Sequence, residues 1–161
     1  MSVHRSIRIL FAFVAAAFVG YVVASVLFTT VNLIRLSEVG AEISLTDAVR
    51  TIWFDLRGMA PSFIWTQYGS LIVIGLAIAF PVAALLRHLA VIANVASIGP
   101  WLYPLAGVVA IVMILVLSYQ EYEVYAFAGA RGWLGGLAQC FAGACAGYLF
   151  QVLTSRSEAR S

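Results

Sequence analysis

Four long stretches without a charged side chain set the strongest limit on how this chain of 161 residues can fold. They are Ile9–Ile34, Gly58–Leu86, Leu89–Gln120 and Gly132–Ser155. Each is longer than the about 20 apolar residues that an α-helix needs to cross a bilayer core. Only 10% of the residues are charged, against about 25% in a soluble domain, which leaves too few to build a polar shell. The sequence therefore predicts an all-α integral membrane protein.

We predict a single transmembrane domain over residues 1–161, because no linker, repeat or shift in composition divides the chain. Its four helices are expected to form a bundle, with spans at residues 9–34, 61–86, 100–119 and 132–153. Pro61 and Pro100 stand where the second and third spans begin, positions at which a helix tolerates a missing N–H. The first span also has the basic start of a secretory signal. Its uncharged run exceeds the about 7–15 residues of a signal core, so we favour an uncleaved anchor over cleavage.

The placement of arginine predicts the orientation of the chain. All basic residues are arginine, a bias that suggests a bacterial genome rich in GC. With four spans, five arginines share a side with both termini, against four on the opposite side: Arg5, Arg8, Arg87, Arg156 and Arg160, against Arg35, Arg50, Arg57 and Arg131. Basic residues that flank the first helix usually weigh most. We therefore expect a multi-pass protein of the bacterial inner (plasma) membrane with both termini in the cytoplasm.

A short amphipathic helix is predicted between the first and second spans, at about residues 45–57. The stretch "SLTD" is similar to a capping box, with Ser44 at the N-cap and Asp47 in place of the usual Glu or Gln. Apolar residues that include Leu45, Val49 and Trp53 would share one face of this helix. Such a helix is expected to lie at the membrane interface as a connector, while a docking element for a partner is the alternative.

Glycine and other small residues gather on one stripe of the fourth span. At 100° per residue the stripe is about 100° wide, and it contains Gly132, Gly136, Gln139, Cys140, Gly143 and Gly147. Within lipid, small residues let two helix backbones approach closely, as in GxxxG pairs. The stripe therefore predicts a helix-packing interface. The first three spans of the same chain are the simpler partner for it, and another membrane protein or a second copy of the chain is the alternative.

An aromatic cluster marks the loop between the third and fourth spans. Together with the amphipathic helix it offers an outer docking face, made of Trp53, Tyr119, Tyr122, Tyr125 and Arg131. Tyrosine and arginine are frequent in binding hot spots. Aromatic residues also form interfacial belts at both surfaces of a membrane, which is the simpler interpretation.

The sequence predicts no catalytic residues, no metal site and no cofactor. Its two histidines are far apart in the sequence, so we interpret them as residues of the membrane boundary. Cys140 and Cys145 do not have the CxxC spacing of a zinc or redox site. The middle of every span lacks ionisable residues, which argues against ion-coupled transport. The formal charge of +2 also argues against nucleic acid as a partner.

These observations favour a small non-catalytic accessory or scaffold protein that packs against other membrane helices through its glycine-rich fourth span. Its partners would be the lipid bilayer and either another membrane protein or a second copy. The alternatives are a small channel or carrier for an uncharged or lipid-like substrate, and a quinone- or haem-associated subunit of a membrane redox complex.

Overall fold

The structure is a computed structural model that describes residues 3–60, 68–122 and 132–158. All regular structure in these ranges is helical: α1 (Val3–Glu38), α2 (Leu45–Gly58), α3 (Tyr68–Ile92), the short 3₁₀-helix η1 (Ala96–Trp101), α4 (Leu102–Tyr122) and α5 (Gly132–Glu158). Four helical segments are long and apolar enough to cross a membrane, namely α1, α3, η1 with α4, and α5. This confirms the all-helical fold class with four candidate spans, as expected for a multi-pass membrane protein.

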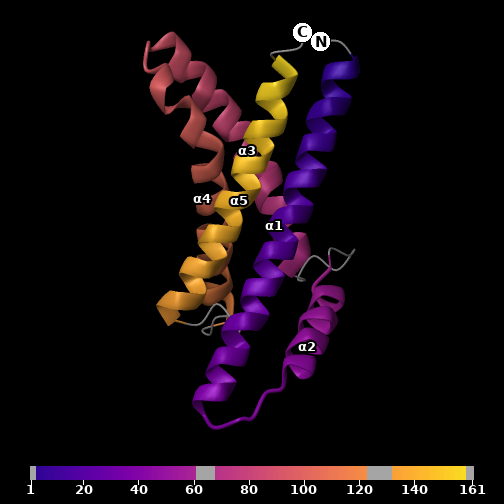
Figure 1. Cartoon of the computed structure of the whole chain (residues 1–161). Helices are drawn as coiled ribbons and strands as arrows, with labels where there is room; N and C mark the ends of the chain where they lie inside the picture. The colour runs from indigo at the N-terminus through magenta and orange to yellow at the C-terminus, as the bar shows by residue number, and fades with distance from the viewer. Residues whose placement is uncertain (1–2, 61–67, 123–131, 159–161) are drawn as a thin grey trace.

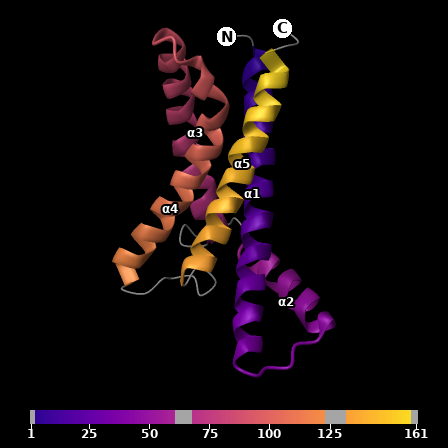
Figure 2. The same ribbon diagram turned by 60° about the vertical axis from the view of Figure 1, so that its left-hand side comes forward.

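Helix α5 occupies the centre of the arrangement. It packs along α1 on one side and along α4 on the other, while α3 packs mainly against α4 (Figure 1). The start of α1 and the end of α5 lie at the same end of the bundle in both views (Figure 2). At this end α3 and α4 lean away from α1 and α5, and α1 makes few contacts with α3.

The helices run past several of the predicted span limits. Helix α3 continues to Ile92 instead of stopping at residue 86, and the predicted start at residues 61–67 lies outside the described part of the chain. Asn94 ends this helix with φ of +59°, and the Val95 N–H donates to the Ala90 carbonyl at 2.9 Å. This is a Schellman ending, which closes the helix independently of membrane depth. Charged side chains mark where a span meets water, whereas capping decides where the helix stops.

Helix α2 forms where the sequence predicts it, one residue longer than expected. The Ser44 hydroxyl accepts from the Asp47 N–H and donates to the Asp47 carboxylate at 2.6 Å, which completes the cap. The other end of the helix rests on α1, because the Thr29 hydroxyl donates to the Asp55 carboxylate at 2.7 Å. The Tyr21 hydroxyl likewise donates to the Leu56 carbonyl. The predicted apolar face is therefore divided: part of it covers α1, and a row made of Leu45, Val49 and Trp53 stays exposed.

Glycines bring α4 and α5 into backbone contact. A Cβ atom added at Gly143 would lie 2.7 Å from the carbonyl carbon of Gly107, and one added at Gly147 would lie 2.7 Å from the Cα of Pro104. On the other side of α5, a Cβ atom at Gly20 of α1 would lie 2.8 Å from the Cβ of Ala146. Close approach of this kind replaces the hydrophobic drive that is missing between helices in lipid.

A buried glutamine connects three of the helices. Gln139 of α5 has no exposed surface. Its Nε2 donates to the Ala24 carbonyl of α1 at 3.1 Å, and its Oε1 accepts from the Tyr68 hydroxyl of α3. Without Gln139, both of these groups would lose the hydrogen bond that it makes with them.

Replacing Gln139 with leucine is expected to lower the free energy of unfolding by about 1–2 kcal/mol, because the Tyr68 hydroxyl would lose its acceptor. Thermal denaturation in detergent, followed by size-exclusion chromatography, measures the effect. Gln151→Leu on the same helix is the matched control. Within the described part of the chain, the buried Oε1 of Gln151 has no hydrogen-bond partner, so this change should leave the melting temperature unchanged or raise it. Equal destabilisation by both changes would contradict the prediction.

Candidate functional site: an apolar groove at the terminal end

A groove of about 770 Å³ opens at the end of the bundle where α1 begins and α5 ends. We call it the terminal groove. Its lining comes from four helices: Ser6, Arg8, Ile9, Leu10 and Phe13 of α1, Ala77, Phe80, Pro81, Ala84, Arg87, His88 and Val91 of α3, Tyr103 of α4, and Phe150, Leu153 and Thr154 of α5. The volume falls within the range of about 300–1,000 Å³ that is typical of small-molecule sites.

The wall formed by α3 explains why space remains between the helices. Its lining residues recur every three or four positions, which places them on one helix face. Ala77, Pro81 and Ala84 on this face have small side chains, so they do not fill the gap between α3 and α1. Pro81 also lacks the N–H that would bond to the Ala77 carbonyl. The Ala77 carbonyl therefore lacks its usual helical donor.

Aromatic rings form the floor of the groove. Phe80 and Phe150 stack with their ring centroids 4.4 Å apart. Tyr103 contacts both of them edge-on, at 6.0 Å from Phe80 and 5.0 Å from Phe150. Phe13 of α1 completes the cluster at 6.2 Å from Phe80. The cluster joins all four long helices at the deep part of the groove. The groove is partly open, and Pro81 and Ala84 of its α3 wall are exposed.

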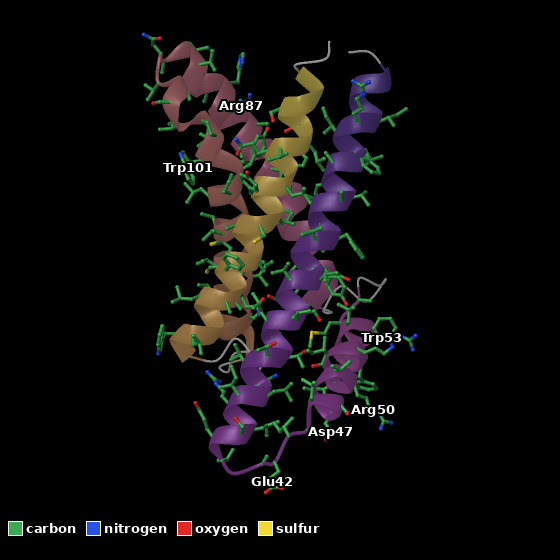
Figure 3. The ribbon with its side chains drawn as sticks, viewed as in Figure 1. Glu42, Asp47, Arg50, Trp53, Arg87 and Trp101 are labelled. Carbon is green, nitrogen blue, oxygen red and sulfur yellow. The ribbon has the colours of Figure 1, made fainter. Side chains whose placement is uncertain are left out.

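The rim of the groove is basic. Arg8 of α1 and His88 of α3 are exposed, and Arg87 of α3 is half-buried near the terminal end of the bundle (Figure 3). The stem of Arg87 lies across η1, because a Cβ atom added at Gly99 would meet its Cγ at 3.9 Å. Among the described lining residues there is no Asp or Glu. The sequence itself has no acidic residue before Glu38 or between Asp55 and Glu121.

The predicted glycine stripe lies apart from the groove and divides into two parts. Gly143 and Gly147 pack against α4 of the same chain, and Gln139 contacts α1 and α3. Gly136 is different, since a Cβ atom there would meet no other atom within 4 Å. Gly132 is the first residue of α5 and has a φ of +78°, which favours glycine. A Cβ atom there would lie 2.8 Å from a nitrogen of the Arg35 guanidinium. Cys140 is half-buried and its thiol is free.

The predicted outer docking face falls largely outside what the structure describes. Trp53 is 55% exposed on α2, with the Arg57 guanidinium 4.7 Å over its ring. It lies on the side of α2 that faces away from the bundle, as does Arg50 (Figure 3). Tyr119 and Tyr122 belong to the last turns of α4. Tyr125 and Arg131 lie outside the described residues.

Sequence reasoning did not find the terminal groove, because its walls come from distant segments. It treated Arg87 and His88 only as boundary residues and Phe80 and Phe150 only as parts of spans. One local signal was available: Ala77, Pro81, Ala84 and His88 form a narrow stripe of small and basic residues on one face of the helix. A face of small residues that ends in basic ones differs from the surface that a helix normally turns to lipid.

No protein-family model matches the chain, and comparisons with curated proteins and with solved structures find no match. The functional argument therefore depends on the geometry of the terminal groove.

Proposed function

We propose that this protein binds a lipid-like amphiphile, with the hydrocarbon part of the ligand in the terminal groove. The observation that carries the proposal is a partly open apolar groove with an aromatic floor and a basic rim in a helical bundle. An opening between α1 and α3, which make few contacts with each other, would let a molecule enter from the membrane without passing through water. This corresponds to one of the alternatives that the sequence leaves open, a lipid-like substrate.

The depth of the groove favours such a ligand. From Arg87 to Ala77 helix α3 rises about 15 Å at 1.5 Å per residue. The hydrocarbon core of a bilayer is about 30 Å thick, so this distance is the depth of one leaflet. A hydrocarbon chain that starts at the basic rim and ends at the Phe80–Phe150 stack would extend about 10 Å along α3, or about two thirds of one leaflet. The groove thus matches a membrane lipid in the order of its polar and apolar parts.

We infer that the groove faces the cytoplasmic leaflet of a bacterial inner membrane, with both termini in the cytoplasm. The support is the arginines at the terminal end, which the positive-inside rule assigns to the cytoplasm. From Arg8 to Thr29 helix α1 rises about 32 Å, which matches the thickness of the core. Thr29, and with it α2, would then lie at the opposite interface. An exposed Trp53 there favours an interfacial position for α2.

Native mass spectrometry after purification in mild detergent tests the proposal. The parent protein, incubated with phosphatidylglycerol and phosphatidylcholine, is expected to retain one lipid molecule. Ala84→Trp would fill the groove and weaken retention by about tenfold or more, a loss of about 1.4 kcal/mol. Val82→Trp is the matched control, because Val82 is 51% exposed on the same helix and does not line the groove. Equal retention by the parent and both variants would contradict the proposal.

An accessory role remains the second candidate, and the exposed row of Leu45, Val49 and Trp53 on α2 favours it. The glycine stripe supports this role less than the sequence suggests, because Gly143 and Gly147 already pack within the chain. A partner would therefore contact α2 rather than α5. Cross-linking from position 49 to another membrane protein in intact cells would support the accessory role, and cross-links to lipid alone would argue against it.

A further inference from the structure

We propose that the terminal groove selects an anionic phospholipid, whose headgroup is held by Arg87 and Arg8 at the rim. This inference rests on the proposed function and adds the chemical class of the headgroup. It starts from the contrast between the two ends of the groove: rings of Phe80 and Phe150 close one end, whereas the other carries two guanidinium groups and an imidazole.

Charge complementarity carries the inference. Arg87 and His88 of α3 and Arg8 of α1 all line the groove, so two different helices contribute basic side chains to it. No acidic residue is among the described residues of the lining, and the sequences of α3 and α4 contain none until Glu121. A zwitterionic headgroup would gain from a carboxylate near its cationic part, and the described lining contains none. A phosphate diester needs only donors, and guanidinium groups supply them in a planar fork.

Hydroxyl groups extend the polar rim. Ser6 of α1 and Thr154 of α5 line the same end of the groove. The Thr154 hydroxyl donates to the Phe150 and Gln151 carbonyls, at 2.8 Å and 3.0 Å, so its oxygen can still accept from a hydroxylated headgroup. The position also suits the ligand, because anionic lipids are concentrated in the cytoplasmic leaflet and bind basic pockets between helices there. We therefore assign the groove to an anionic phospholipid rather than to a neutral lipid or a free fatty acid.

A lipid titration with two headgroups tests the inference. Phosphatidylglycerol and phosphatidylcholine with identical acyl chains are added to delipidated protein, and bound lipid is counted by native mass spectrometry. The parent is expected to prefer phosphatidylglycerol. Arg87→Gln should weaken phosphatidylglycerol binding by roughly fivefold, the effect of about one basic side chain near an anionic headgroup, and weaken phosphatidylcholine binding less, because the choline cation offsets the charge of its phosphate. Arg50→Gln, on the outward side of α2, is the matched control and should change neither.

Further variants separate recognition from stability. Arg87→Lys keeps the charge and should retain most of the preference, whereas a loss caused by misfolding would affect both lipids. Arg8→Gln repeats the test from a different helix, so the inference does not depend on one residue. Equal binding of the two lipids by the parent, or a preference that survives Arg87→Gln and Arg8→Gln together, would overturn it.

The two proposals fail in different ways. If the parent retains both lipids equally and Ala84→Trp retains neither, the groove binds lipid and only the headgroup assignment is wrong. If the parent retains no lipid, or Ala84→Trp retains as much as the parent, the groove is not a lipid site and both proposals fall. Oleic acid is added as a third ligand, and its binding in preference to phosphatidylglycerol would also overturn the headgroup assignment.

Discussion

Replacing Gly143 with alanine is expected to lower the free energy of unfolding by about 2–3 kcal/mol, as typical for overpacking in a tight interface. The added methyl group would lie 2.7 Å from the carbonyl carbon of Gly107 and 2.8 Å from the Ile111 side chain. Backbone atoms cannot turn aside as a flexible side chain does, so α4 and α5 would have to separate along their contact. Thermal denaturation in detergent, with monodisperse protein as the readout, measures the loss.

Gly136→Ala is the matched control for this change. It lies on the same helix and in the same predicted stripe, but its surroundings are open within 4 Å. Alanine forms helix more readily than glycine by about 1 kcal/mol, so this variant should melt at the parent temperature or higher. The two substitutions are chemically identical and should have effects of opposite sign. If Gly143→Ala and Gly136→Ala melt together, the contact between α4 and α5 does not stabilise the protein.

Phe80→Ala is expected to lower the free energy of unfolding by about 3 kcal/mol, since removal of a buried aromatic ring leaves a cavity. Phe80 is 2% exposed and contacts the rings of Phe13, Tyr103 and Phe150, which come from three other helices. Its loss therefore affects the point at which all four long helices meet. It would also remove the floor of the terminal groove, so the variant should melt earlier and retain lipid more weakly.

Phe18→Ala provides the comparison for the aromatic cluster. Phe18 is 64% exposed on α1, so its removal should change stability by no more than about 0.5 kcal/mol. Both variants are measured in the same detergent by thermal denaturation and lipid retention. A Phe80→Ala protein that melts like Phe18→Ala would mean that the cluster does not hold the bundle together.

Fold class could be predicted from the sequence because it depends on signals within single segments. Uncharged runs longer than a bilayer crossing identify helices, and the Ser44–Asp47 cap identified the start of α2. Helix ends were less predictable. The extension of α3 to Ile92 depends on Asn94 adopting a left-handed conformation, for which the charge pattern gives no signal.

Packing partners could be predicted only in part. A helical wheel shows which face of a helix a residue lies on, but not which residue of the neighbouring helix lies at the same level. It placed Gly136 and Gly143 on one stripe, but only Gly143 lies level with Gly107 of α4. The terminal groove was not predicted, since Phe80 and Phe150 are distant in the sequence and meet only when α3 and α5 cross. Pairing between distant segments decides such sites, and a single sequence without relatives contains little information about it.

The central position of α5 has a consequence for how the molecule is made. The chain leaves the ribosome from its amino end, so α5 emerges after the other three candidate spans. Until then α1 and the α3–α4 pair have little surface to share. Gly20 and Gly107 have no α5 to pack against during this interval. Helix α5 therefore joins the bundle by insertion between two parts of the chain that were made before it.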